Sequence, residues 1–242
     1  MKIKFERLEI VETGNNLGPW NLAVDEFLLS KSNDPVLRIY GWSRPCVSIG
    51  YFQSIDEVDY EKCKKEGVDV VRRMTGGGAV FHDKELTYSF VTKKFPNNIM
   101  ESYQQICQLI ISALKSLGFA AKFSPLNDIT INGKKVCGNA QTRKNNTLLQ
   151  HGTILLDVDV ERMFSLLNVP KEKIKDKKIS HIKNRVMGIS KKFEEVADAL
   201  KSSAKKNFQC ELTPYHLDQK DQDSCKKIMN EKYLNKDWSF RR

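Results

Sequence analysis

The chain has 242 residues, of which 40% are hydrophobic and 9% aromatic, a composition typical of a folded protein rather than a disordered one. No apolar run is long enough to cross a bilayer and no signal peptide is visible, so we expect a cytoplasmic protein without a membrane partner. The formal net charge of +10 indicates a lysine-rich surface, and it leaves room for an anionic substrate or an acidic protein partner.

The first half of the chain predicts strands around one helix. Residues 3–11 alternate charged and apolar side chains, which indicates a strand, and residues 21–30 have the spacing of a helix. Further strands are predicted at 36–40, 47–51, 68–73, 79–81 and 87–92.

The clearest helix prediction covers residues 100–117, where apolar side chains recur every three or four positions up to Gly118. Strands are then predicted at 120–123, 128–131, 135–137 and 148–158. The Asn132-Gly133 pair between two of these strands is a hairpin signal. Later helices are predicted at 163–167, 192–204 and 222–233.

These elements predict an α/β (α+β) fold with a mixed, largely antiparallel sheet flanked by helices and a small helical carboxyl-terminal end. We expect residues 1–190 to form the main domain and residues 191–242 a helical segment packed on it. The lysine-dense residues 171–185 predict a solvated loop. Six scattered cysteines without a Cys-x-x-Cys pair indicate reduced thiols, and the histidines do not cluster with them into a structural metal site.

A glycine-rich stretch at residues 72–82, Arg-Arg-Met-Thr-Gly-Gly-Gly-Ala-Val-Phe-His, lies between two predicted strands. Glycine lets a backbone approach a ligand closely, and the two arginines carry planar charged groups suited to a carboxylate or phosphate. The spacing matches neither a Walker A loop nor a Rossmann fingerprint. The stretch therefore favours a ligand with an anionic head and an apolar body.

This stretch, followed by Leu-Thr-Tyr-Ser-Phe at residues 86–90, resembles the lipoate-protein ligase family, which is related to biotin ligases and octanoyltransferases. The Asn127-Asp128 pair, the Gly-Lys-Lys-Val-Cys-Gly-Asn-Ala segment at 133–140 and His-Gly-Thr at 151–153 follow in the family's order. The resemblance covers about residues 15–190 and implies a biotin/lipoate ligase-like catalytic domain.

The leading function that the resemblance implies is an ATP-dependent lipoate-protein ligase. Lipoate and ATP with Mg²⁺ would give lipoyl-adenylate, and a lysine of an acceptor would then attack the acyl carbon and expel AMP. Lys135 matches the family's essential lysine, whose ammonium would lie between the two anionic reactants. Asp128 is the candidate Mg²⁺ ligand.

The resemblance also implies a set of substrate- and nucleotide-binding residues: Arg72, Arg73, Gly76, Gly77, Gly78, Ala79, Val80, Phe81, His82, Asn127, Gly138, Ala140, His151, Thr153, Lys183 and Arg185. The last two belong to a loop that is similar to the family's adenylate-binding loop. Expected partners are the lipoyl domains of 2-oxoacid dehydrogenases, the glycine-cleavage H protein or a related carrier. Many bacterial ligases carry a further accessory domain, so a separate accessory subunit is also a candidate partner.

An alternative comes from residues 83–87 and 141–143, which resemble the octanoyltransferases of the same fold. Those enzymes move an octanoyl group from acyl carrier protein through a thioester on a cysteine upstream of the Asn-Asp pair, where residues 120–125 contain none. Strand alternation would place Cys137 on the face of Lys135, whose charge would favour the thiolate. A third hypothesis, a basic nucleic-acid-binding protein, has no supporting motif, so we do not expect nucleic acid as a partner.

Overall fold

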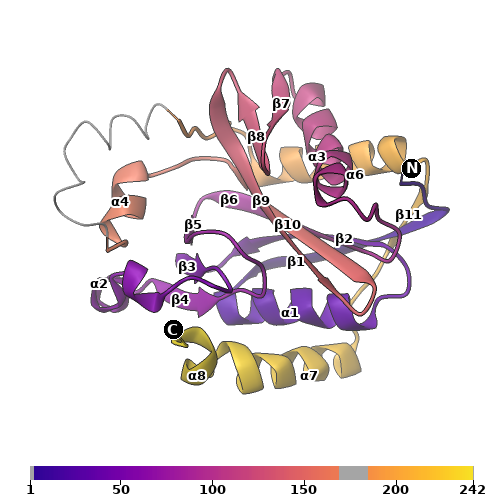
Figure 1. Cartoon of the computed structure of the whole chain (residues 1–242). Coiled ribbons are helices and arrows are strands. Elements are labelled where there is room, and N and C mark those ends of the chain that lie inside the picture. The colour runs from indigo at the N-terminus through magenta and orange to yellow at the C-terminus, as the bar shows by residue number, and fades with distance from the viewer. Residues whose placement is uncertain (1–2, 169–184, 242) are drawn as a thin grey trace.

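An eight-stranded sheet forms the centre of the protein in the computed structural model, which describes residues 3–168 and 185–241 (Figure 1). Its strands are, in spatial order, β11 (Glu211–Pro214), β1 (Arg7–Asn16), β2 (Val36–Trp42), β6 (Glu85–Thr92), β10 (Thr147–Leu155), β9 (Lys134–Lys144), β8 (Asp128–Ile131) and β7 (Ala121–Ser124). Strand β1 runs parallel to both of its neighbours, and the other neighbouring pairs are antiparallel. The predicted mixed, largely antiparallel sheet is confirmed.

A second sheet has three strands in the order β4 (Asp69–Arg72), β3 (Cys46–Ile49) and β5 (Val80–His82). A short 3₁₀ turn, Ile55–Glu57, and helix α2 (Tyr60–Lys65) connect β3 to β4. The glycine-rich stretch joins β4 to β5, and β5 leads directly into β6 of the large sheet. Both ends of the glycine loop therefore lie in the small sheet, and β5 links that sheet to the large one.

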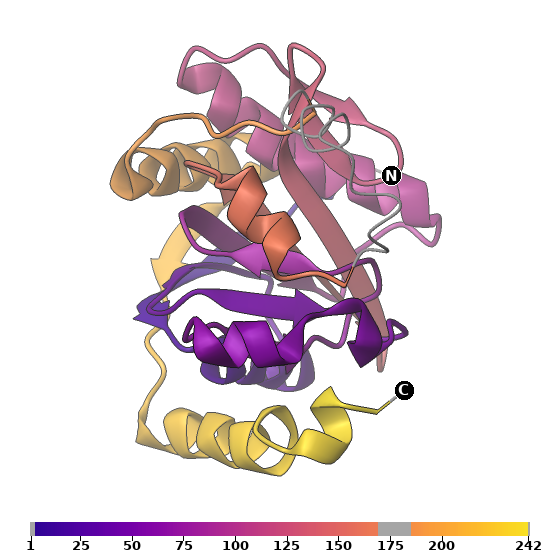
Figure 2. The same ribbon diagram turned by 90° about the vertical axis from the view of Figure 1, so that its left-hand side faces the viewer.

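Helices cover both sides of the large sheet. Helix α1 (Gly18–Lys31) lies below it in Figure 1, with α7 (Gln219–Ile228), a π-helical turn at Met229–Tyr233 and α8 (Lys236–Ser239) further out. Helices α3 (Ile99–Ser116) and α6 (Phe193–Phe208) pack together on the opposite side, as Figure 2 shows from a second direction. Helix α4 (Val160–Ser165) follows β10.

The helix around residues 100–117 is confirmed, and its physical cause is visible at both ends. The Asn98 side chain caps the first turn by accepting a hydrogen bond from the amide of Glu101 at 3.0 Å. Gly118 follows the last turn with a φ of 91°, a conformation that glycine adopts without strain. The apolar face buries Ile106, Ile110 and Leu114 completely in the main core.

Several short elements were not predicted, and some boundaries of the longer ones differ from the prediction. Strand β11 and helices α2 and α8 are four to six residues long, too short for a periodic pattern. The first strand begins at Arg7 rather than at residue 3, and the last long helix begins at Gln219 and changes to the π-helical turn at Met229. The Asn-Gly hairpin is confirmed, with φ of 51° at Asn132 and 78° at Gly133.

The carboxyl-terminal part is built into the rest of the molecule. Strand β11 adds a parallel edge to β1, and α7 packs against α1. The division into residues 1–190 and 191–242 remains a prediction. Within residues 3–168 and 185–241, no helix has the length and apolar character needed to cross a membrane. All six cysteines are buried and none forms a disulfide.

Candidate active site

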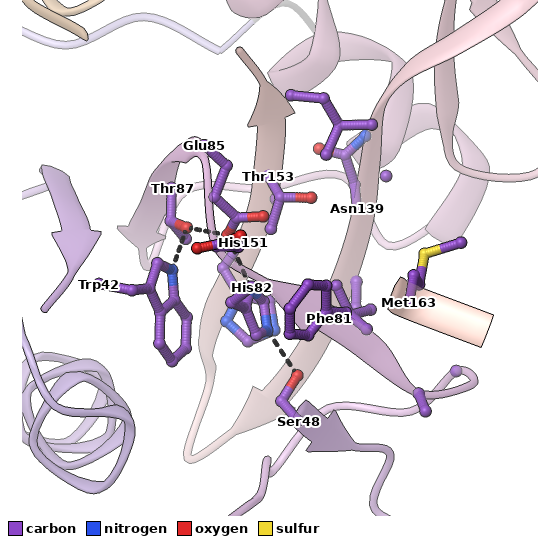
Figure 3. A pocket seen from close by; sticks show the side chains of 18 of the residues that line it. Trp42, Ser48, Phe81, His82, Glu85, Thr87, Asn139, His151, Thr153 and Met163 are labelled. Carbon is purple, nitrogen blue, oxygen red and sulfur yellow. Dashed lines mark hydrogen bonds and ion pairs between the residues drawn. The ribbon is translucent and has the colours of Figure 1, made fainter. Parts of the chain in front are cut away.

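A cavity of about 370 Å³ opens between the two sheets, and most of its wall is apolar. Strands β5, β6, β9 and β10, the glycine loop and the start of α4 form this wall, and Figure 3 shows part of it. The structure brings most of the predicted binding residues to the cavity, namely Arg73, Gly76, Gly77, Gly78, Ala79, Val80, Phe81, His82, Asn127, Gly138, Ala140, His151 and Thr153. Lys135 also lines it.

The glycine loop is held in place by Arg73. Its guanidinium donates hydrogen bonds to the carbonyls of Gly76 and Gly78, each at 2.8 Å, and to the carbonyl of Ser48 at 2.7 Å. Burial lowers the pKa of this guanidinium to about 10. Arg73 therefore shapes the loop from behind, and its charge is largely engaged by backbone carbonyls.

Arg72 does not reach the cavity, contrary to the expectation that it binds substrate. Its side chain is fully buried and donates to the carbonyls of Gly50 at 2.8 Å and Gln53 at 2.6 Å. It also donates to the carbonyls of Ser239 at 3.1 Å and Arg241 at 2.8 Å. Alternation along β4 turns Arg72 away from Arg73, so Arg72 anchors the carboxyl-terminal segment instead.

Lys135 lies on the cavity wall beside Asp128. The Nζ of Lys135 is 2.8 Å from Oδ1 of Asp128, as an ion pair rather than as a well-aligned hydrogen bond. The two side chains are 39% and 31% exposed, and of the two only Lys135 lines the cavity. A Cβ added at Gly138 would lie 2.8 Å from both Cε and Nζ of Lys135, so the lysine side chain occupies the space over this glycine.

A bulge in β9 decides which side chains accompany Lys135. Ile129 faces Cys137 across the β8–β9 ladder, but the next residue of β8, Thr130, faces Lys135, so Val136 is an extra residue in β9. Lys135 and Cys137 therefore point to opposite faces of the sheet, and the expectation that they share a face is wrong. Cys137 is fully buried in the core, and burial raises the pKa of its thiol well above the usual value.

Three further predicted residues are Asn127, Lys183 and Arg185, of which the structure describes the first and the last. Asn127 and Asn139 clamp β8 to β9, since the side-chain amide of each donates to the backbone carbonyl of the other. Arg185 does not line the cavity, but its carbonyl accepts a hydrogen bond from the amide of Lys135 at 2.6 Å. Lys183 lies outside the described residues, as does most of the predicted basic loop.

His151 connects the cavity wall to a buried carboxylate. Its Nδ1 donates to Asp25 at 3.2 Å, and its Nε2 accepts from the Thr75 hydroxyl at 2.7 Å in the neutral tautomer. Burial lowers the pKa of His151 below its usual 6.5 by more than Asp25 raises it, so the ring is neutral near pH 7. This arrangement makes His151 a structural support of the glycine loop.

His82 belongs to a second polar chain that sequence reasoning did not find. Its Nε2 lies 2.7 Å from Oγ of Ser48, and its Nδ1 lies 2.6 Å from Oε1 of Glu85 (Figure 3). The indole of Trp42 stacks on the imidazole with a centroid separation of 3.9 Å and an interplanar angle of 13°. Ser48, Trp42 and Glu85 come from three different strands, and no sequence motif links them.

The residues around Asp128 give no further evidence for the predicted Mg²⁺ site. Within the described residues, no group of three histidine, cysteine, aspartate or glutamate side chains could hold a metal ion. The carboxylate of Asp128 instead faces the ammonium of Lys135. Its place beside Lys135 indicates that it orients the lysine, and a metal-binding role remains a prediction.

Comparisons with known proteins identify relatives over nearly the whole chain. The family model of the lipoyl protein ligase A/B catalytic domain matches residues 18–208. The octanoyltransferase LipM of Halalkalibacterium halodurans is 34% identical over 275 aligned positions that cover 98% of this chain and 100% of the relative. LipM of Bacillus subtilis is 32% identical, with coverage of 98% and 99%.

Lipoate-protein ligases are among the solved structures that resemble this chain. A bi-partite ligase from Thermoplasma acidophilum, studied together with its E2 lipoyl domain, has a TM-score of 0.88 and 28% identity, covering 98% of this chain and 96% of that one. A lipoate-protein ligase A bound with ATP has a TM-score of 0.83 and 27% identity, and 99% of each chain is covered.

These comparisons contradict the leading functional prediction. The curated relatives that are 30–34% identical over more than nine tenths of this chain are octanoyltransferases, not ATP-dependent ligases. The glycine loop and the Lys135 segment indicated the correct family. They did not separate its two chemistries, because this chain resembles octanoyltransferases and lipoate-protein ligases alike.

Proposed function

This chain belongs to the lipoyl protein ligase A/B catalytic domain family, and from that premise we propose that it is an octanoyltransferase. It moves an octanoyl group from a carrier-bound thioester to the lysine amine of a lipoyl acceptor domain. The curated relatives support the acyl group that is moved. The T. acidophilum relative, studied with its E2 lipoyl domain, supports the class of acceptor.

The observation that carries the proposal is the Lys135 ammonium, which lies on the wall of a largely apolar cavity and pairs with Asp128. The cavity offers an acyl chain a mostly apolar environment, and the ammonium offers a positive charge where the acyl carbonyl would lie. Burying the chain contributes about 0.8 kcal/mol per methylene group. Such binding holds the carbonyl in position for attack.

The reaction follows from these groups. The acceptor lysine, as a neutral amine, attacks the thioester carbonyl, and the Lys135 ammonium stabilises the oxyanion that forms. The carbon–nitrogen bond forms, the carbon–sulfur bond breaks, and the proton lost by the attacking nitrogen goes to the leaving thiolate. Asp128 keeps the Lys135 side chain extended over Gly138.

The transfer is direct, without an acyl-enzyme on Cys137. All six cysteines are buried, and none lines the cavity. Burial also raises the pKa of the Cys137 thiol, which disfavours the thiolate that a nucleophile requires. The formal net charge of +10 would increase the rate of encounter with acidic carriers and acceptors.

The test compares Lys135→Ala with Lys134→Ala, a change to the preceding lysine, which does not line the cavity. Octanoyl transfer from octanoyl-carrier protein to a lipoyl acceptor domain is followed by mass spectrometry. We expect Lys135→Ala to lose about a hundredfold or more in kcat/KM, as removal of an oxyanion donor does elsewhere, and Lys134→Ala to stay near wild type. A wild-type protein inert toward the thioester, or a fully active Lys135→Ala variant, contradicts the proposal.

A further inference from the structure

On the side of β2, the wall of the cavity includes two stacked rings. Trp42 and His82 both line the cavity, and they are only 8% and 6% exposed. Their centroid separation of 3.9 Å leaves no space for an acyl chain between them. Figure 3 shows the two rings beside each other, with Ser48 and Thr87 bonded to them. Trp42 and His82 are called the end wall below.

A single carboxylate oxygen holds both rings of the end wall. Oε1 of Glu85 accepts from Nδ1 of His82 at 2.6 Å and from the hydroxyl of Thr87 at 2.7 Å. The Thr87 oxygen in turn accepts from Nε1 of Trp42 at 2.8 Å. Ser48 then donates to Nε2 of His82, which completes the tautomer assignment.

The buried carboxylate of Glu85 has one oxygen whose burial is unfavourable for stability. It is 4% exposed, and its second oxygen, Oε2, has no hydrogen-bond partner among the described residues. A buried carboxylate oxygen without a partner is costly, and such a group in a folded protein calls for a functional explanation.

The sheet register gives the distance between the end wall and Lys135. Thr87, Thr153 and Gly138 lie opposite one another on β6, β10 and β9, and all three line the cavity. Two strand spacings give about 10 Å from Thr87 to Gly138, where the Lys135 ammonium lies. An extended eight-carbon acyl chain with its carbonyl at Lys135 has this length, so its last carbon would meet the end wall.

We propose that Glu85 is a positioning residue that sets the longest acyl chain the cavity accepts, because it holds Trp42 and His82 together as a closed wall. The inference rests on the proposed function in so far as the ligand is an acyl chain. The role proposed for Glu85 is to limit the length of the acyl group, whereas the role proposed for Lys135 is in the transfer of that group.

The test measures the binding of free hexanoate, octanoate, decanoate and dodecanoate by calorimetry, so that no transfer is needed. Two variants remove hydrogen bonds that hold the wall without truncating either ring: Glu85→Gln, and Thr87→Val, which keeps the side-chain shape but disconnects Trp42 from Glu85. Glu26→Gln and Thr92→Val are matched controls, because Glu26 accepts from Lys232 and Tyr233, Thr92 lies elsewhere on β6, and neither lines the cavity.

We expect wild type and both controls to bind octanoate best and to bind decanoate and dodecanoate more weakly. In both wall variants, the affinity for decanoate relative to octanoate should rise about tenfold, because the two added methylenes become buried. A general loss of stability would weaken all four ligands together and leave this ratio unchanged. Thr87→Val keeps the test decisive if Glu85→Gln does not fold.

The outcomes separate the two proposals. Wall variants that keep the wild-type ratio, or a wild-type protein that binds dodecanoate as well as octanoate, overturn the role of Glu85 even if octanoyl transfer is observed. A chain that transfers no octanoyl group, yet shows the length limit and its loss in the wall variants, supports the role of Glu85 and overturns the proposed function.

Discussion

At the scale of single residues, Asp25 on α1, which is 1% exposed, is the carboxylate at the centre of a buried polar network. Its Oδ1 accepts from Arg38 at 2.6 Å and from Ser89 at 2.8 Å, and its Oδ2 accepts from Tyr40 and His151, each at 3.2 Å. Burial raises the pKa of Asp25, but the Arg38 charge and the His151 hydrogen bond outweigh it, so the pKa lies below the usual 3.8.

Asp25→Asn should destabilise the protein strongly. Arg38 is fully buried, and the change would leave its charge without a charged partner, which costs about 3 kcal/mol or more. Urea unfolding measures this loss. Asp34→Asn is the control, because Asp34 pairs with Arg7 at the surface and such pairs contribute less than about 1 kcal/mol.

The pH dependence of unfolding follows from the lowered pKa. The stabilising contribution of ionised Asp25 is complete above pH 3.8 and is lost as the pH falls through the lower folded-state pKa. The wild-type free energy of unfolding should therefore fall more steeply below about pH 4 than that of Asp25→Asn. Equal slopes for the two proteins, or a loss in Asp25→Asn no larger than in Asp34→Asn, would show that Asp25 is not the ionised centre of this network.

Single residues also show what the sequence could and could not predict. Lys135 and the three glycines could be predicted because each lies in a contiguous family motif, at residues 133–140 and 72–82. Trp42, Ser48 and Glu85 were not found, because only the folded arrangement of β2, β3 and β6 brings them to His82. Arg72 and Arg73 look equivalent in sequence, but strand alternation sends one to the carboxyl terminus and the other to the glycine loop.

At the scale of elements, the bulge in β9 determines which face of the sheet carries Lys135. It reverses the alternation between Lys135 and Cys137 and brings Lys135 to the face that carries Asp128 and Gly138. The hairpin before it was predictable, because Asn-Gly has a strong conformational preference. The bulge was not predictable, because no residue of Lys135–Cys137 requires one, and the error over Cys137 follows from this.

Gly138→Ala tests how closely this element controls Lys135. The added methyl group would lie 2.8 Å from Cε and Nζ of Lys135, so the flexible end of that side chain must move away from its present position. We expect kcat for octanoyl transfer to fall about a hundredfold while the melting temperature changes little, because a displacement of about 1 Å suffices for such a loss. Unchanged kcat in a folded variant would mean that the position of Lys135 over Gly138 is not required.

At the scale of the whole molecule, the fold was predictable because long strands and α3 have clear periodicity and because the glycine motif belongs to one family. The chemistry was not predictable to the same degree. An acyl-adenylate and a carrier thioester both present an acyl carbonyl to a lysine amine, and a cavity with the Lys135 ammonium on its wall suits either. The difference lies in the donor that the cavity receives.

The donor requirement therefore decides between octanoyltransferase and ligase chemistry. Acceptor octanoylation is measured with two donors, octanoyl-carrier protein without nucleotide, and free octanoate with ATP and Mg²⁺. We expect rapid transfer from the carrier in the absence of ATP and no greater transfer from free octanoate with ATP. Transfer that occurs only with free acid and ATP would contradict the proposed function and would place this chain with the ligases that share its fold.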